Sequence, residues 1–228
     1  AEPHATVVQR PMAGVLAATT GVVLWGCLVP LAKAAEDVNP IVLGFHRLWM
    51  GAIAVLLVFY ATGGRLSRQT LRTSFWGGVL FGLDIIFFFS AIKLTTVANA
   101  TIVGALQPAL LLYVGARWFG EQVNTALIGL TVVAISGAGI VAIGSASGGS
   151  DDWSLLGDVC ALLALASWTG YFIASKRARD SLSSLEYLAA FLVVATIVVA
   201  PFALVAPGPF DPGAEGWLIV FVVAVLSG

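Results

Sequence analysis

The stretch TSFWGGVLFGLDIIFFFSAI, residues 73–92, decides the fold class of this chain. It carries one ionisable residue, Asp84, and is flanked by Arg72 and Lys93. Its length matches the about 20 residues that an α-helix needs to cross a bilayer. Because Arg72 and Lys93 fix its ends, the segment has no room to slide until Asp84 reaches either interface. We therefore predict a transmembrane helix over 73–93 with a carboxyl group inside the span.

The composition extends this prediction to the whole chain. Hydrophobic residues make up 59% of the sequence, charged residues 10%, and the mean hydropathy is +0.99. Soluble domains are about 45–50% apolar and about 25% charged, so a soluble fold is excluded. A net charge of −1 without a basic run argues against a nucleic-acid partner. Cys27 and Cys160 lie in apolar stretches, where a small buried hydrophobe is the ordinary role of cysteine.

The apolar stretches between turn signals give an all-α polytopic membrane protein. We predict helices over 12–35, 41–62, 73–93, 97–118, 125–146, 154–177 and 184–206, separated by Gly, Pro and Asn turn sequences. An eighth segment begins at Trp217. At about 1.5 Å per residue, 217–228 covers roughly 18 Å of a bilayer core of roughly 30 Å. We expect the native protein to continue beyond this sequence and to complete that helix.

The basic residues predict the orientation, because cytoplasmic loops retain Lys and Arg. One side holds Arg10, Arg65, Arg68, Arg72, Arg117, Lys176, Arg177 and Arg179, and the other holds Lys33 and Lys93 at helix ends. We predict a multi-pass protein of the plasma (inner) membrane with a cytoplasmic N-terminal tail over 1–11. The segment 147–153 is then an external linker.

The chain contains an internal repeat. A shift of 143 residues (168 − 25) aligns Trp25 with Trp168 and Lys33 with Lys176, so the sixth helix resembles the first. The sixth helix comes five helices after the first, an odd number, so the copies run in opposite directions across the membrane. Many secondary transporters have such inverted repeats. We predict a first five-helix repeat over 12–146 and a second over 154–228 that ends within its third helix, from a ten-helix (5+5) fold.

Several motifs resemble a known family. The stretch 90–101, SAIKLTTVANAT, is followed by Gln107-Pro108, by Phe119-Gly120-Glu121 and by a glycine-rich helix; Leu24-Trp25-Gly26 lies in the first helix. Together they resemble the EamA family of the drug/metabolite transporter superfamily. The resemblance implies a ten-helix carrier of two inverted repeats that exports more often than it imports. These motifs are helix-packing patterns and do not identify a substrate.

Asp84 and Arg47 are the sharpest candidates for function. An ionisable group at the centre of a span costs about 2.5–3.5 kcal/mol on insertion scales, so it faces a cavity or a partner. Arg47 and His46 lie at a depth similar to that of Asp84, which permits an ion pair between Arg47 and Asp84. The alternatives are that Asp84 has a structural role and that Arg47 snorkels to the interface.

Other candidates for the translocation path lie near the same level. Pro108 removes one helix hydrogen bond and leaves a carbonyl group free beside the Gln107 amide. Trp25 and Trp168 are suited to stacking on an organic solute, and Asn99 and Tyr171 to hydrogen bonding. Packing, a structural kink and interhelical hydrogen bonds are the alternative roles. Glu121 is interpreted as a structural acid that caps or pairs at the inner face.

The sequence favours a secondary transporter of a small organic solute, a metabolite or an amino acid. No nucleotide-binding loop, zinc motif or nucleophile elbow is present, so we predict no cofactor, metal or enzymatic activity. An intramembrane enzyme using Asp84 and Asp158 and a structural or assembly protein are the alternatives. Proton coupling requires a group that changes charge, for which Asp84 and His46 are the candidates. The substrate, the direction of transport and the oligomeric state are not encoded in recognisable motifs.

Overall fold

The computed structural model describes residues 39–95, 97–146 and 154–227, and Met12, Leu16, Thr19 and Thr20 in the N-terminal segment. Within these residues the regular structure is helical, without strands. Its helices are α3 (Pro40–Ala61), α4 (Arg68–Leu94), α5 (Val97–Ala105), α6 (Gln107–Phe119), α7 (Thr125–Ala146), α8 (Leu155–Ala178), α9 (Ser184–Val205) and α10 (Gly213–Ser227). Apart from those four residues, the helix predicted over 12–35 lies outside the described residues.

The described helices have the lengths and composition of membrane spans. Five helical segments are long and apolar enough to cross a bilayer: Pro40–Ala61, Arg68–Leu94, Ile102–Phe119, Leu155–Ala178 and Ser184–Val205. Many of their large apolar side chains are exposed on the protein surface, which lipid would cover. The all-helical, multi-pass membrane architecture expected from the sequence is therefore confirmed. The count of ten helices and the repeat boundaries stay predictions.

Side-chain caps define where the helices begin. Asn39 accepts a hydrogen bond from the backbone N–H of Ile41 at 3.0 Å, and Pro40 starts α3 with its φ already fixed. Ser67 accepts from the N–H of Thr70 at 3.0 Å, so α4 begins at Arg68 and not at the predicted 73. The prediction placed Arg68 and Arg72 in a loop. In the structure these two residues form the first turns of α4, which begins before the apolar segment.

The span predicted over 97–118 is divided at Leu106. The N–H of Leu106 bonds to the carbonyl of Val103 at 3.1 Å, a three-residue spacing that interrupts the α-helical ladder. Pro108 follows in the first turn of α6, where its missing N–H is tolerated. The predicted distortion at Pro108 is present, and it separates two helices, α5 and α6.

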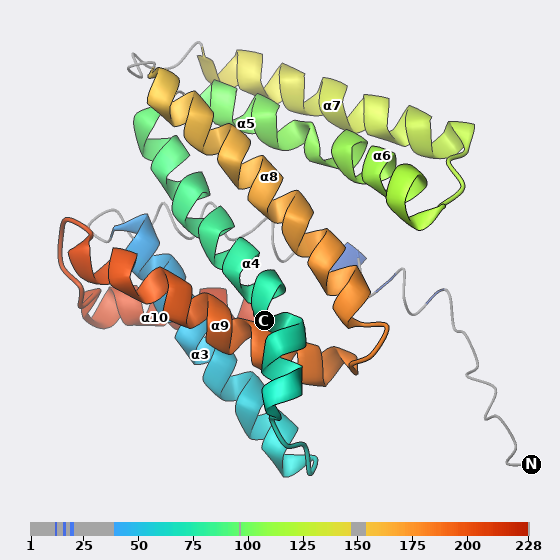
Figure 1. The fold of residues 1–228 in the computed structure, drawn as a ribbon. Coiled ribbons are helices and arrows are strands. Elements are labelled where there is room, and N and C mark those ends of the chain that lie inside the picture. The colour runs from blue at the N-terminus through green and yellow to red at the C-terminus, as the bar shows by residue number, and fades with distance from the viewer. Residues whose placement is uncertain are drawn as a thin grey trace, which may run out of the picture.

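Helix α4 packs between α8 and α9 at the centre of the described fold (Figure 1). Glycines allow the close approach to α9: a Cβ at Gly78 would lie 2.7 Å from the Phe191 carbonyl oxygen, and one at Gly82 3.3 Å from that of Ala195. The four-residue spacing of Gly78 and Gly82 thus serves close helix packing. The main buried cluster joins this helix to its neighbours through Leu48, Phe81, Ile85, Phe191 and Val199.

The remaining helices lie on two sides of this centre. Helices α5, α6 and α7 lie together on one side of α8, and α3 and α10 pack on the α9 side (Figure 1). Helix α10 begins at Gly213, four residues before the predicted start at Trp217. It packs on α3 through a cluster of Val42, Leu43, Ala203 and Val220.

Candidate functional site

A cavity of about 220 Å³ lies between α3, α4, α8 and α9, in the middle of the described bundle. We call it the aromatic cavity because the rings of Phe81, Trp168, Tyr171 and Phe191 line it. Arg47 is the one charged residue among its lining residues, which also include Leu48, Gly51, Leu188, Leu192 and Ala224. The cavity therefore offers an apolar aromatic surface with a single cationic group.

The aromatic residues hold one another in place. The Phe81 ring lies 5.0 Å from that of Tyr171 and 5.5 Å from that of Phe191, between centroids, and the Trp168 ring lies 5.7 Å from that of Tyr171. Tilted and edge-on pairs at such distances are the favourable aromatic geometries. Helices α4, α8 and α9 each contribute to this ring set, so their packing determines the cavity's shape.

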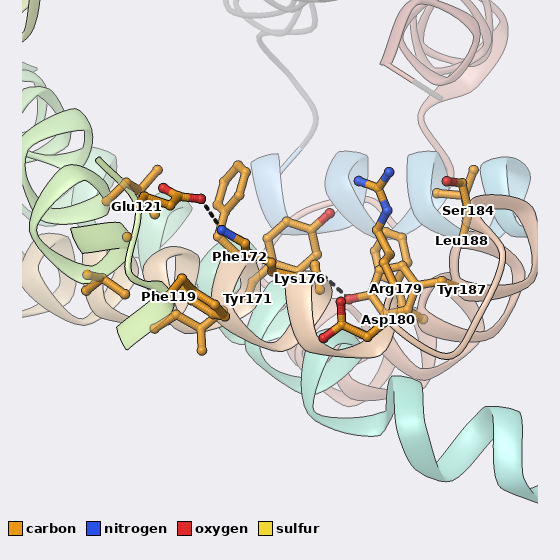
Figure 2. Close-up of a pocket in the computed structure, with 16 residues that line it drawn as sticks. Phe119, Glu121, Tyr171, Phe172, Lys176, Arg179, Asp180, Ser184, Tyr187 and Leu188 are labelled. Carbon is orange, nitrogen blue, oxygen red and sulfur yellow. Dashed lines mark hydrogen bonds and ion pairs between the residues drawn. The ribbon is translucent and has the colours of Figure 1, made fainter. Parts of the chain in front are cut away.

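A larger cavity of about 820 Å³ opens between α6, α8 and α9 at the end of the bundle that carries most of the basic residues. We call it the basic-end vestibule. Its mouth carries Glu121, Lys176, Arg179 and Asp180 (Figure 2). Figure 2 shows Lys176 and Glu121 reaching toward one another as an ion pair, and the Lys176 ammonium lies 4.3 Å from the centroid of the Phe119 ring. This geometry agrees with the interpretation of Glu121 as a pairing acid.

The two cavities meet at Tyr171, Leu188 and Phe191, which line both. These three side chains form the boundary between the charged vestibule and the aromatic cavity, whose lining includes Arg47. Tyr187 supports this boundary from α9: its ring stacks on Phe191 at 5.2 Å, and its hydroxyl lies 2.7 Å from that of Ser175 on α8. We refer to the two cavities and their shared boundary as the tract.

Arg47 on α3 and Asp84 on α4 are the pair of ionisable residues that the sequence placed at a similar depth. Their charges lie close enough to interact, although no nitrogen–oxygen pair between these two described residues is within 4.0 Å. Both side chains are half-buried. Asp84 follows Phe81 of the aromatic cavity by three residues, which is about one helical turn. Arg47 lines the aromatic cavity, and Asp84 lies one turn from Phe81, which also lines it.

His46 lies outside this group, in a packed aromatic cluster at the other end of the bundle. Trp49 donates its indole N–H to His46 Nδ1 at 2.9 Å, and His46 Nε2 lies 2.9 Å from the Phe210 carbonyl oxygen. Since Nδ1 accepts, Nε2 carries the proton and donates it to that carbonyl. The bond to Phe210 connects α3 to the segment between α9 and α10, and the bond from Trp49 lies within α3.

Asn99 and Gln107 lie apart from Arg47. Asn99 donates to Asp158 Oδ1 at 3.1 Å, and Thr95 Oγ1 donates to the same oxygen at 2.6 Å. Thr95 ends α4 eleven residues after Asp84, about 16 Å along the axis, so Asp84 and Asp158 form no catalytic pair. Gln107 is half-buried at the break between α5 and α6, and the contacts of α6 are with α5, α7 and α8.

The structure places Trp168 and Tyr171 in the aromatic cavity, whereas Trp25 lies outside the described residues. Sequence reasoning missed Phe81, Phe191 and the vestibule residue Arg179. The two phenylalanines have no local signal in so apolar a chain, except that Phe81 precedes Asp84 by one turn. Arg179 was interpreted only as a determinant of topology.

The sequence profile of the EamA-like transporter family matches residues 12–143 and 155–228. Curated relatives include the pseudopaline exporter CntI of Pseudomonas aeruginosa, 25% identical over 189 residues, or 82% of this chain and 65% of the relative. The aromatic amino acid exporter YddG of Ancylobacter novellus is 28% identical over 213 residues, 90% of this chain and 72% of the relative. This chain thus spans about two thirds of the length of these transporters.

One protein of known crystal structure matches 94% of this chain with a TM-score of 0.81, and the match covers 74% of that protein. At 23% sequence identity, this likeness concerns the fold alone.

Proposed function

We propose that this chain, which belongs to the EamA-like transporter family, is a secondary transporter that exports a small organic solute. The proposal includes the ten-helix plan of two inverted repeats, with transport by alternating access between them. The observation that carries the proposal is the tract, in which the basic-end vestibule and the aromatic cavity share Tyr171, Leu188 and Phe191.

The tract opens at the basic end of the bundle, and export rests on the names of the exporter relatives. The basic end is cytoplasmic by the positive-inside rule, so the vestibule opens toward the cytoplasm. At the opposite end of α3, Asn39 donates to the Pro207 carbonyl at 3.0 Å and His46 donates to that of Phe210. A solute is therefore loaded from the cytoplasm while these contacts hold the external ends of the helices together.

The lining of the cavity suggests the class of solute. Aromatic rings offer stacking surface to an apolar or aromatic body. Arg47 offers a forked donor to a carboxylate, and Asp84 offers an acceptor to an ammonium group. An amino acid or an amino-acid-like metabolite carries all three features. The names of the two relatives, an aromatic amino acid exporter and a pseudopaline exporter, agree with a small organic cargo.

Asp84 is the group that we assign to proton coupling. Protonation of His46 at Nδ1 would set its new N–H against the indole N–H of Trp49, so His46 is poorly placed to exchange protons. The Asp84 carboxylate has no hydrogen bond among the described residues, and it lies one helical turn from Phe81, which lines the aromatic cavity. A proton on Asp84 would alternate with the ammonium group of the solute.

The test is counterflow by the full-length protein in proteoliposomes, with labelled amino acids, sugars and cationic drugs. We expect accumulation of a zwitterionic amino acid. Tyr171→Ala should change the apparent affinity or rate at least several-fold, because Tyr171 lines both cavities. Tyr113→Ala is the matched control: Tyr113 lies on α6 with 66% of its surface exposed. A folded sample that transports none of the compounds, or equal effects of both variants, would overturn the proposal.

A further inference from the structure

A surface groove at the basic end of the bundle is separate from the tract. It lies between α4 and α9, encloses about 1050 Å³, and is lined by Arg68, Arg72, Phe75 and Trp76 of α4 and by Val193 and Ile197 of α9, among others. Trp76 and Ile197 keep 64% and 66% of their surfaces exposed. The groove is therefore open on the side of the bundle that faces lipid.

The α4 side of the groove carries one continuous stripe. Arg68, Arg72, Phe75 and Trp76 are spaced i, i+4, i+7 and i+8, which places them on one helix face. The two arginines form the first turns of α4, and the two aromatic residues follow one turn deeper. Trp and similar aromatic residues are enriched at the level of lipid headgroups. The stripe thus runs from two cations at the interface into the apolar layer.

The two arginines have no acidic partner in the described part of the chain. Neither forms an ion pair within 4.0 Å. The one acid in the α9 sequence, Glu186, accepts a hydrogen bond from Thr70 Oγ1 at 2.6 Å, and Thr70 lies on the buried side of α4. Two forked cationic donors one turn apart therefore face an open groove, and their complement is an anion with several acceptor oxygens.

The α9 side of the groove contributes apolar side chains. Val193 and Ile197 lie 9 and 13 residues after Ser184, the start of α9. At about 1.5 Å per residue this places them about 14–20 Å along the helix from the basic end. An anion bound to the arginines would thus lie at one end of a groove whose other lining residues, Val193 and Ile197 among them, are apolar. A free phosphate ion would leave that groove without an occupant.

We propose that the groove between α4 and α9 binds an anionic phospholipid, with its phosphate on Arg68 and Arg72 and an acyl chain along Val193 and Ile197. Basic pockets between transmembrane helices on the cytoplasmic side bind anionic headgroups by the same physics. This site depends on membrane insertion and not on transport, so it stands whether or not the tract carries a solute. A lipid seated there would stabilise the contact between α4 and α9 that shapes the aromatic cavity.

The test uses the full-length protein in detergent, with native mass spectrometry to count bound lipids and a thermal melt to measure stabilisation. Phosphatidylglycerol should bind and raise the melting temperature, whereas phosphatidylcholine should do so weakly. Each arginine near the surface contributes about 1 kcal/mol toward anionic lipid, so Arg68→Gln with Arg72→Gln should weaken binding about 30-fold. Arg68→Lys with Arg72→Lys should lose less binding than the Gln pair, because the charge remains although the forked donors are lost.

The matched control is Arg65→Gln with Arg117→Gln, which removes two exposed arginines from the same end of the bundle without touching the groove. This double variant should leave phosphatidylglycerol binding within about two-fold, since long-range charge alone is screened. Equal losses in the two double variants would show a diffuse charge effect and overturn the site.

Two further measurements separate the lipid from other occupants. Ile197→Trp fills the apolar part of the groove from an exposed position, and it should reduce lipid binding at least five-fold while leaving the arginines in place. Inorganic phosphate or glycerol phosphate should not reproduce the stabilisation by phosphatidylglycerol. Equal stabilisation by these soluble anions would overturn the lipid assignment. So would cross-linking of Trp76→Cys between two copies in lipid, because a second copy would then occupy the groove.

Discussion

The hydroxyl group of Tyr187 on α9 lies in a notch of α4 that exists because residue 77 is a glycine. A Cβ atom at Gly77 would overlap the Tyr187 hydroxyl and lie 3.1 Å from its ring carbon Cζ. The same hydroxyl lies 2.7 Å from Ser175 Oγ on α8. One side chain thus joins α4, α8 and α9 at the base of the vestibule, and its ring supports Phe191 at the boundary between the two cavities.

Gly77→Ala should therefore lower the free energy of unfolding by about 1–3 kcal/mol, the usual cost of an added methyl group in a packed interior. Tyr187→Phe in the same protein should recover most of this loss, because it removes the overlapping oxygen. Gly129→Ala is the control: nothing lies within 4 Å of its added Cβ, so it should be neutral or stabilising by up to about 1 kcal/mol. Unfolding in mixed micelles measures all four proteins. Equal stability of the Gly77 and Gly129 variants would contradict the inference that Tyr187 requires a glycine at position 77.

Asp84→Asn should impair transport, and Arg47→Ala combined with Asp84→Ala should do no worse than either single change. The reason is that each single change leaves an uncompensated charge within the span. Counterflow rates for Arg47→Ala, Asp84→Ala, the double variant and the parent form a double-mutant cycle, in which residues of one charge network show a coupling energy of about 0.5–3 kcal/mol. Losses that simply add would show that the two charges act independently.

His46→Gln should destabilise the protein and leave the dependence of transport on pH unchanged. The change disturbs two hydrogen bonds of a buried ring, and loss of each bond costs about 1–3 kcal/mol when its partner stays buried. Asp84→Asn should have the opposite pattern, with little pH dependence left in whatever transport remains. The measurements are thermal unfolding and counterflow across a series of pH values. A flattened pH profile in His46→Gln would instead make His46 the coupling group.

Lys176→Gln should change the free energy of unfolding by less than about 1 kcal/mol. The side chains of the pair with Glu121 are 45% and 56% exposed, and ion pairs in contact with water contribute about 0–1 kcal/mol. The difference from the parent should shrink further in high salt, because exposed charges are screened. Unfolding at low and high ionic strength provides the check. A salt-independent loss of several kcal/mol would mean that the pair is shielded from water in the folded protein.

The sequence by itself determined that this protein lies in a lipid bilayer, and it located most of its helices. Uncharged stretches of sufficient length require lipid on their outside, because backbone polar groups in a bilayer must be satisfied within a helix. The same reasoning identified Asp84, since no shift of its helix brings it to an interface. Helix ends were harder: Arg68 and Arg72 marked a loop in the prediction, whereas the Ser67 cap places them within α4. Lys and Arg are compatible with helical turns beyond the apolar layer, so charge alone does not locate a helix start.

Only the tertiary structure decided which residues share a site. Similar depth placed Arg47, Asp84 and Gln107 at one level, but depth does not specify the direction in which a helix face points. Packing brought Arg47 to Phe81, Trp168 and Tyr171, and left Gln107 among α5, α7 and α8. Phe81 and Phe191 carried no signal because aromatic residues are common throughout an apolar chain. Their role follows from the contact of α4 with α9, which the small volume of Gly77, Gly78 and Gly82 makes close.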